Sequence, residues 1–253
     1  MTLLCIVLWG TKQVQVLEMA KSAALFLSPG ELRVTTAKML FSVAFLAALC
    51  SDLNLAFALP QVSTSAPQAK IQNGTVEGFH LSSYNQDLFL GIPYAQPPIG
   101  PLRYRVPQSL NKTYSSTLEA KAYYPECVGY GGDDIGYQVS EDCLALNVIR
   151  PAGNESQKLP VAVWIHGGGL QMGGTADRRY NLSFIVQNSV EIGKPIIGVS
   201  IGYRLASWGF LYSQEVQGSG NTNLGLRDQR LALHWLQENI AAFGGDPSRV
   251  SLD

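Results

Sequence analysis

The stretch Leu159-Pro-Val-Ala-Val-Trp-Ile-His-Gly-Gly-Gly-Leu170 decides the fold of this chain. Its first half, Val161 to Ile165, is a short apolar run rich in β-branched residues and entered from Pro160, which is typical of a buried strand. Its second half contains three successive glycines, where no Cβ keeps other atoms away from the backbone. The sequence therefore predicts a buried strand that delivers a glycine loop to one edge of a sheet.

The glycine loop has two interpretations. Three glycines can form a flexible turn with no further role. They can also present backbone N–H groups that hold the negative oxygen of a tetrahedral ester adduct, the arrangement called an oxyanion hole. The sequence around the loop must decide between these interpretations.

Downstream segments alternate between strand and helix. Ile196 to Ile201 is a second buried strand candidate, and Asn223 to Phe243 is the clearest helix, with apolar residues at a four-residue step. Gly244-Gly245-Asp246-Pro247 ends this helix, and Arg249 to Asp253 begins another strand. This order predicts an α/β fold with a mixed, mostly parallel sheet and flanking helices.

Upstream segments add shorter elements. Asn73-Gly74 lies between alternating residues and predicts an N-terminal antiparallel hairpin at an edge of the sheet. Asp87 to Gly91 is a short strand candidate, and Ser140 to Ile149 turns into a strand after Cys143. Four prolines between Ile92 and Pro101 exclude regular structure there.

Composition excludes several classes of partner. The 253 residues include 18 Lys and Arg against 19 Asp and Glu, a net charge of -1, and no basic stripe. We therefore expect no nucleic acid partner. The sequence shows no metal-ligand cluster and no nucleotide-binding loop, so we expect no cofactor.

The N-terminal part predicts export. Met39 to Ser51 is an uncharged run of 13 residues, and Ala56-Phe57-Ala58 fits a cleavage site, so residues 39–58 are interpreted as a signal peptide. A membrane span needs about 20 apolar residues, so no transmembrane segment is expected. A buried core helix is the alternative. Because a signal belongs at the chain start, residues 1–38 are interpreted as a mis-assigned extension, with Thr2 to Trp9 as an alternative signal.

Cysteines and glycosylation triplets agree with a secreted, extracellular protein. Cys127 and Cys143 remain after the predicted leader, and such a pair indicates a disulfide, with two free buried thiols as the alternative. A loop of this size would contribute roughly 3 kcal/mol. Four N-x-S/T triplets are candidate glycosylation sites, at Asn73, Asn111, Asn154 and Asn181.

Five segments share the order of a known family. They are Phe89–Gly100 with Leu102–Tyr104, Ser140–Leu144 with Leu146–Val148, Val163–Gly169, Tyr203–Phe210, and Gly225–Leu233 running to Gly244–Pro247. Together they resemble the type-B carboxylesterase and lipase family of α/β-hydrolases. The resemblance implies a secreted serine hydrolase that acts on a small-molecule or lipid ester. It says nothing of the oligomeric state.

The resemblance also implies roles for single residues. It aligns Gly168 and Gly169 with the oxyanion-hole glycines, and Cys127 and Cys143 with a family disulfide. Two positions depart from the family pattern, since Leu170 and His166 stand where aromatic residues are usual. For His166, a supporting hydrogen bond and a merely packed ring are both open.

The catalytic serine of the family is expected beyond Asp253. Residues 59–253 then form the N-terminal part of an incomplete α/β-hydrolase domain that stops before the G-x-S-x-G nucleophile elbow, and all triad members follow. Gly198-Val-Ser-Ile-Gly202 matches the elbow literally, but no helical start follows it, so Ser200 is interpreted as a strand residue. His80 and His234 do not fit the triad order. The alternatives to an esterase are a non-catalytic binding module and an inactive fragment.

Overall fold

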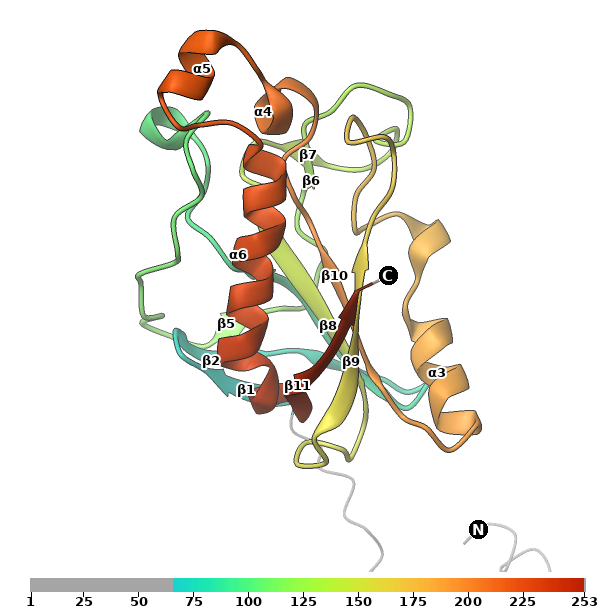
Figure 1. Ribbon diagram of the computed structural model, residues 1–253. Coiled ribbons are helices and arrows are strands. Elements are labelled where there is room, and N and C mark those ends of the chain that lie inside the picture. Colours follow the sequence, from blue (N-terminus) through green and yellow to red (C-terminus); the bar gives the residue numbers. More distant parts are fainter. Residues whose placement is uncertain (1–65, 253) are drawn as a thin grey trace, which may run out of the picture. The chain divides into compact units, whose positions relative to one another are not determined.

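The computed structural model describes residues 66–252, so the expected signal peptide and N-terminal extension lie outside the described residues. The described strands form a six-stranded, a three-stranded and a two-stranded sheet (Figure 1). The strands are β1 (Gln68–Ile71), β2 (Gly74–Glu77), β3 (Phe79–Leu81), β4 (Gln86–Pro93), β5 (Leu118–Glu119), β6 (Glu126–Cys127), β7 (Val139–Ser140), β8 (Ala145–Pro151), β9 (Leu159–Ile165), β10 (Ile197–Ile201) and β11 (Gly245–Leu252). The helices are η1 (Gly100–Leu102), η2 (Arg178–Tyr180), α3 (Ser183–Glu191), α4 (Ala206–Phe210), α5 (Gln214–Gly218), α6 (Leu224–Asn239) and η3 (Ile240–Phe243).

The six-stranded sheet has the order β11-β9-β10-β8-β4-β3. The strand β9 lies parallel to both β10 and β11, while β8 pairs antiparallel with β10 and β4, and β4 pairs antiparallel with β3. The sheet is mixed, as predicted, but its parallel part is smaller than expected, because three of the five pairings described are antiparallel. Parallel neighbours need long crossovers, and here α3 and α6 provide them.

The elements predicted around the glycine loop are confirmed. The strands β9 and β10 cover the two buried runs, and α6 with η3 spans the expected helix. Gly244 ends this helical stretch with a φ of 86°. The last strand begins at Gly245, earlier than expected, and its register with β9 shifts between Gly245 and Val250, where Pro247 donates no hydrogen bond.

The N-terminal hairpin is confirmed, but its place is not. The strands β1 and β2 pair antiparallel around a turn at Gln72 and Asn73. They do not extend the main sheet, because β2 instead pairs with β5 in the separate three-stranded sheet. The hairpin is anchored to the end of α6, where the backbone N–H of Gln72 donates to Asn239 Oδ1 at 2.9 Å.

Two helices cover opposite faces of the main sheet (Figure 1). The helix α6 packs its buried Ala232, Trp235 and Leu236 into the larger core, which includes Phe89 and Val148. The helix α3 packs Val186 against side chains of the other face, such as Leu88 and Ile149. Neighbouring residues of one strand thus point to different cores. Between residues 66 and 252, no helix combines the length and apolar character needed to cross a membrane.

Candidate active site

The glycine loop lies where parallel strands end. The strand β9 stops at Ile165, and His166 leads directly into Gly167, Gly168 and Gly169. Because β10 and β11 run parallel to β9, their carboxyl ends reach the same edge of the sheet. In open α/β sheets this edge is where ligands bind.

The loop has an unusual backbone. Gly168, Gly169 and Leu170 have φ values of 113°, 62° and 62°. The turn closes with hydrogen bonds from the N–H groups of Gln171 and Met172 to the carbonyl oxygen of Gly168, at 3.1 and 3.2 Å. At Gly168 a Cβ atom would lie 2.1 Å from the carbonyl oxygen of Met172, whereas at Gly169 it would meet open space. Glycine is therefore required at 168 for space as well as for conformation.

The N–H groups of Gly168 and Gly169 are available. Neither amide donates a hydrogen bond to another described residue, and Gly169 is exposed. Successive backbone amides in positive-φ or turn conformations form concavities that bind anions. The loop can therefore hold a negative oxygen, provided that a reacting group is brought to it.

The buried side chain of His166 supports the glycine loop. Its side chain is 2% exposed and its ring stacks on Tyr203, with a centroid distance of 4.5 Å. Its Nδ1 lies 3.0 Å from the carbonyl oxygen of Gly167, and since a carbonyl only accepts, Nδ1 carries the proton. Burial lowers the pKa of His166, which favours the neutral ring. Both roles left open for His166, the hydrogen bond and the packed ring, are thus present.

Tyr203 was not found by sequence reasoning. Its hydroxyl donates to the backbone carbonyl of His166 at 2.9 Å, so it holds both the ring and the main chain ahead of the glycines. No local pattern indicates this contact, because 37 residues separate the two.

The literal elbow motif is not an elbow in the structure. Ser200 lies inside β10, is 4% exposed, and its hydroxyl accepts from Asn147 Nδ2 at 2.9 Å. The prediction that no helix follows was wrong, because α4 begins at Ala206, whose φ of 47° starts the helix abruptly. The serine nonetheless sits in the paired strand, before the turn that an elbow requires.

The histidines do not complete a triad in the described part. His80, on β3, contacts Asp87 at 3.0 Å through Nδ1. His234 is exposed on α6. Between residues 66 and 252, no serine hydroxyl lies within hydrogen-bond distance of a histidine ring. Nor does that part of the chain bring together three or more His, Cys, Asp or Glu side chains able to hold a metal ion.

Cys127 and Cys143 form a disulfide, with an S–S distance of 1.97 Å. The loop that it closes lies against the segment after the glycines, where the N–H of Tyr130 donates to the carbonyl oxygen of Gln171 at 2.7 Å. A Cβ at Gly129 would lie 2.2 Å from that same oxygen, so the contact is close. The disulfide loop thereby buttresses the glycine loop.

Comparison with known proteins identifies the family of this chain. The model of the Carboxylesterase family matches residues 65–252. The chain belongs to the carboxylesterase family. Its relatives include Lipase 2 of Diutina rugosa, 41% identical over 77% of this chain and 39% of that protein. Secreted lipase 1 of Botryotinia fuckeliana is 39% identical over 77% of this chain and 36% of that protein.

A solved structure shares the fold. The crystal structure of Aspergillus niger EstA superposes with a TM-score of 0.66 and 36% sequence identity, covering 74% of this chain and 35% of that chain. The α/β-hydrolase fold expected from the sequence is therefore confirmed for the described part. The chain spans well under half the length of the relatives it matches.

Proposed function

We propose that this chain provides the oxyanion-stabilising part of a serine hydrolase that cleaves carboxylic esters. Gly168 and Gly169 donate their backbone N–H groups to the negative oxygen of the tetrahedral adduct. The nucleophile, the acid and the base come from residues that follow Asp253 in a longer product.

The unpartnered amides of Gly168 and Gly169 carry this proposal. Each donor of an oxyanion hole contributes about 2.7–4 kcal/mol of transition-state stabilisation. That contribution needs donors fixed before the reaction, and the turn bonds to the Gly168 carbonyl and the ring of His166 hold this loop. Family membership makes ester hydrolysis the reaction that such a hole would serve.

The relatives support a longer product. Lipase 2 of Diutina rugosa is matched over 39% of its length. Without a serine and a base the hole has no adduct to stabilise, so we expect the 253-residue chain alone to show no esterase turnover.

The experiment begins with the DNA after the codon for Asp253. An in-frame G-x-S-x-G motif supports the proposal, and the longer product is then assayed on p-nitrophenyl esters beside its elbow Ser→Ala variant. Turnover that the Ser→Ala change abolishes is the expected result. A substituted elbow serine would favour a non-catalytic binding module, and turnover by residues 59–253 alone would refute the placement of the nucleophile.

We also propose that the protein is exported with residues 39–58 as its signal peptide. A disulfide and a relative named as a secreted lipase support this. The test is N-terminal sequencing of protein recovered from the culture medium, which is expected to begin at Leu59. Retention of the whole product inside the cell would contradict it.

A further inference from the structure

The four N-x-S/T triplets differ in how their asparagine side chains are bonded. Asn73 sits in the turn of the β1–β2 hairpin, and its Nδ2 donates to the carbonyl oxygens of Leu110 at 2.7 Å and Lys112 at 2.8 Å. Its own carbonyl oxygen accepts from the N–H of Tyr114 at 2.7 Å. Both amide hydrogens of Asn73 are therefore used to clamp the 110–114 segment onto the hairpin.

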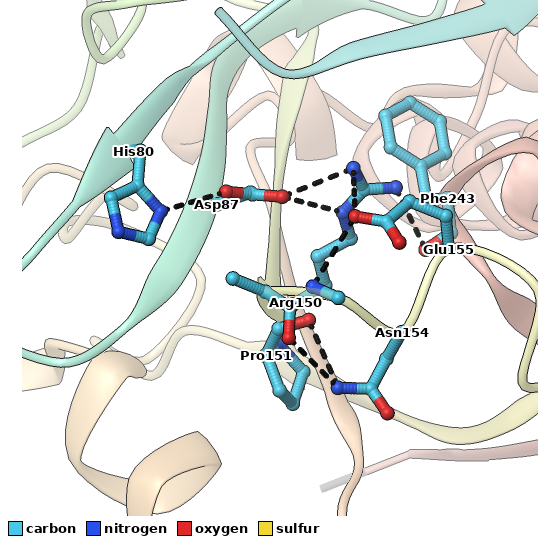
Figure 2. A network of polar contacts seen from close by, with 9 residues as sticks. His80, Asp87, Arg150, Pro151, Asn154, Glu155 and Phe243 are labelled. Atoms are coloured by element: carbon cyan, nitrogen blue, oxygen red, sulfur yellow. Dashed lines mark hydrogen bonds and ion pairs between the residues drawn. The ribbon is translucent and has the colours of Figure 1, made fainter. Parts of the chain in front are cut away.

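Asn154 is bonded in a similar way. Its Nδ2 donates to the carbonyl oxygens of Ala152 at 3.1 Å and Pro151 at 3.4 Å, as Figure 2 shows for the turn after β8. The turn is fixed further by Glu155, whose carboxylate contacts the buried Arg150 at 3.3 Å. The Asn154 side chain is thus part of the turn.

Asn111 is the opposite case. It is exposed, and its side chain makes no hydrogen bond to another described residue. The carbonyls on either side of it, those of Leu110 and Lys112, are the two that Asn73 binds. The clamp therefore fixes the main chain around Asn111 while leaving its side chain in solvent.

We propose that Asn111 carries an N-linked glycan in the folded protein and that Asn73 and Asn154 do not. In the transfer, Asn111 Nδ2 bonds to C1 of a sugar, the bond from C1 to a lipid-linked pyrophosphate breaks, and one amide proton leaves to a base of the transferase. A glycosylated asparagine keeps a single Nδ2 hydrogen. At Asn73 or Asn154 the sugar would replace one of two donated hydrogens and occupy the place of a carbonyl partner.

The test uses the full-length product in yeast, with residues 1–58 replaced by a yeast secretion leader, so that its result does not depend on the proposed signal peptide. An Asn181→Gln background removes the fourth triplet. Secreted, folded protein is deglycosylated by an amidase that converts each modified asparagine to aspartate, and peptides are mapped by mass spectrometry. Conversion at Asn111 with Asn73 and Asn154 unchanged is the expected result.

Two matched variants distinguish the proposed glycan acceptor, Asn111, from Asn73, whose side chain clamps the 110–114 segment. Asn111→Gln is expected to lose one glycan-dependent step in gel mobility, with the thermal midpoint of the deglycosylated protein unchanged. Asn73→Gln is expected to keep that step and to lower the midpoint by several degrees, because the clamp loses its donor geometry. A glycan on Asn73 or Asn154 in the folded fraction, or none on Asn111, would overturn the proposal.

Discussion

At position 168 the backbone leaves room for a hydrogen atom and nothing larger. A Gly168→Ala change places a Cβ against the Met172 carbonyl at a φ of 113°, so the loop must move and both amides shift. We predict a fall in kcat/KM of about 100-fold or more in the full-length enzyme, because loss of even one donor costs about that much.

Gly167→Ala is the matched control, because its Cβ would meet open space at an ordinary φ. Esterase assays and thermal midpoints of both variants provide the comparison. Equal activity of Gly168→Ala and Gly167→Ala would show that the loop geometry does not support catalysis.

The buried carboxyl group of Glu126 leads us to predict that the stability of the protein depends on pH. Its side chain is 4% exposed and both carboxylate oxygens lack a partner in the described part. Burial, with Asp177, Asp134 and Asp133 nearby and Arg179 opposing, raises the pKa of Glu126 to about 7. A raised carboxyl pKa disfavours the ionised folded state, so the free energy of unfolding falls as the pH rises from about 4.5 to about 7.

Glu126→Gln should remove this loss, which is on the order of 3 kcal/mol at pH 8 for a shift of this size. Thermal midpoints at pH 5 and pH 8 measure it, with the variant gaining on the wild type only at pH 8. Glu119→Gln, at a side chain 77% exposed, is the control. If the thermal midpoints of Glu126→Gln and the wild type differed by the same amount at pH 5 and at pH 8, the result would contradict the burial of an unpaired carboxylate.

For single residues, the sequence predicted the glycine loop but not the side chains that hold it in place. Gly168 and Gly169 are contiguous with their strand, so a local pattern finds them. Tyr203 reaches His166 through a tertiary contact, and Glu126 is buried near Asp177 by chain segments distant in the sequence, so no local spacing indicates either environment.

At the scale of secondary-structure elements, a buried ion pair links α6 to the segment that follows β10. Arg204 donates to Asp228 through Nε at 2.8 Å and Nη2 at 2.7 Å, and both residues are buried. Asp228→Asn leaves the Arg204 guanidinium without its counter-ion, so we predict a loss of about 3–5 kcal/mol in the free energy of unfolding.

Urea unfolding of the full-length protein measures this loss. Glu119→Gln serves as the control, because the Glu119 side chain is 77% exposed and lies 3.8 Å from Lys121, and no measurable change is expected there. A loss for Asp228→Asn no larger than that of the control would show that the buried pair does not hold the helix.

Most elements were predictable because their patterns are local. The apolar runs of β9 and β10 and the four-residue step of α6 each span consecutive residues. Pairing was not predictable in the same way, since the hairpin joined β5 rather than the main sheet, and α4 begins at Ala206 with a φ that no propensity favours. The pairing of the hairpin depends on which distant strand has an unpaired edge. The start of α4 depends on the position of Arg204, which Asp228 fixes.

For the whole molecule, β11 is the end strand of the main sheet in the described part. Beside it, an open groove of about 310 Å³ between α6 and β11 is lined by the apolar Leu233, Val250 and Leu252 together with Arg230, His234 and Gln237, and Leu252 is 56% exposed. Unpaired strand edges with apolar side chains promote association.

We therefore predict that residues 59–253, expressed alone, aggregate at micromolar concentration. Light scattering after size-exclusion chromatography measures this, and Leu252→Lys should reduce the aggregated fraction, because an edge lysine opposes pairing. A monodisperse monomer of the unsubstituted chain would contradict the prediction.

The sheet order also affects folding during synthesis on the ribosome. The strand β10 lies between β8 and β9, although both are made before it. At about 5–20 residues per second, β8 waits several seconds with one side unpaired until Ile197 to Ile201 appear. In that interval the nascent chain exposes an unpaired strand edge of the kind that promotes association.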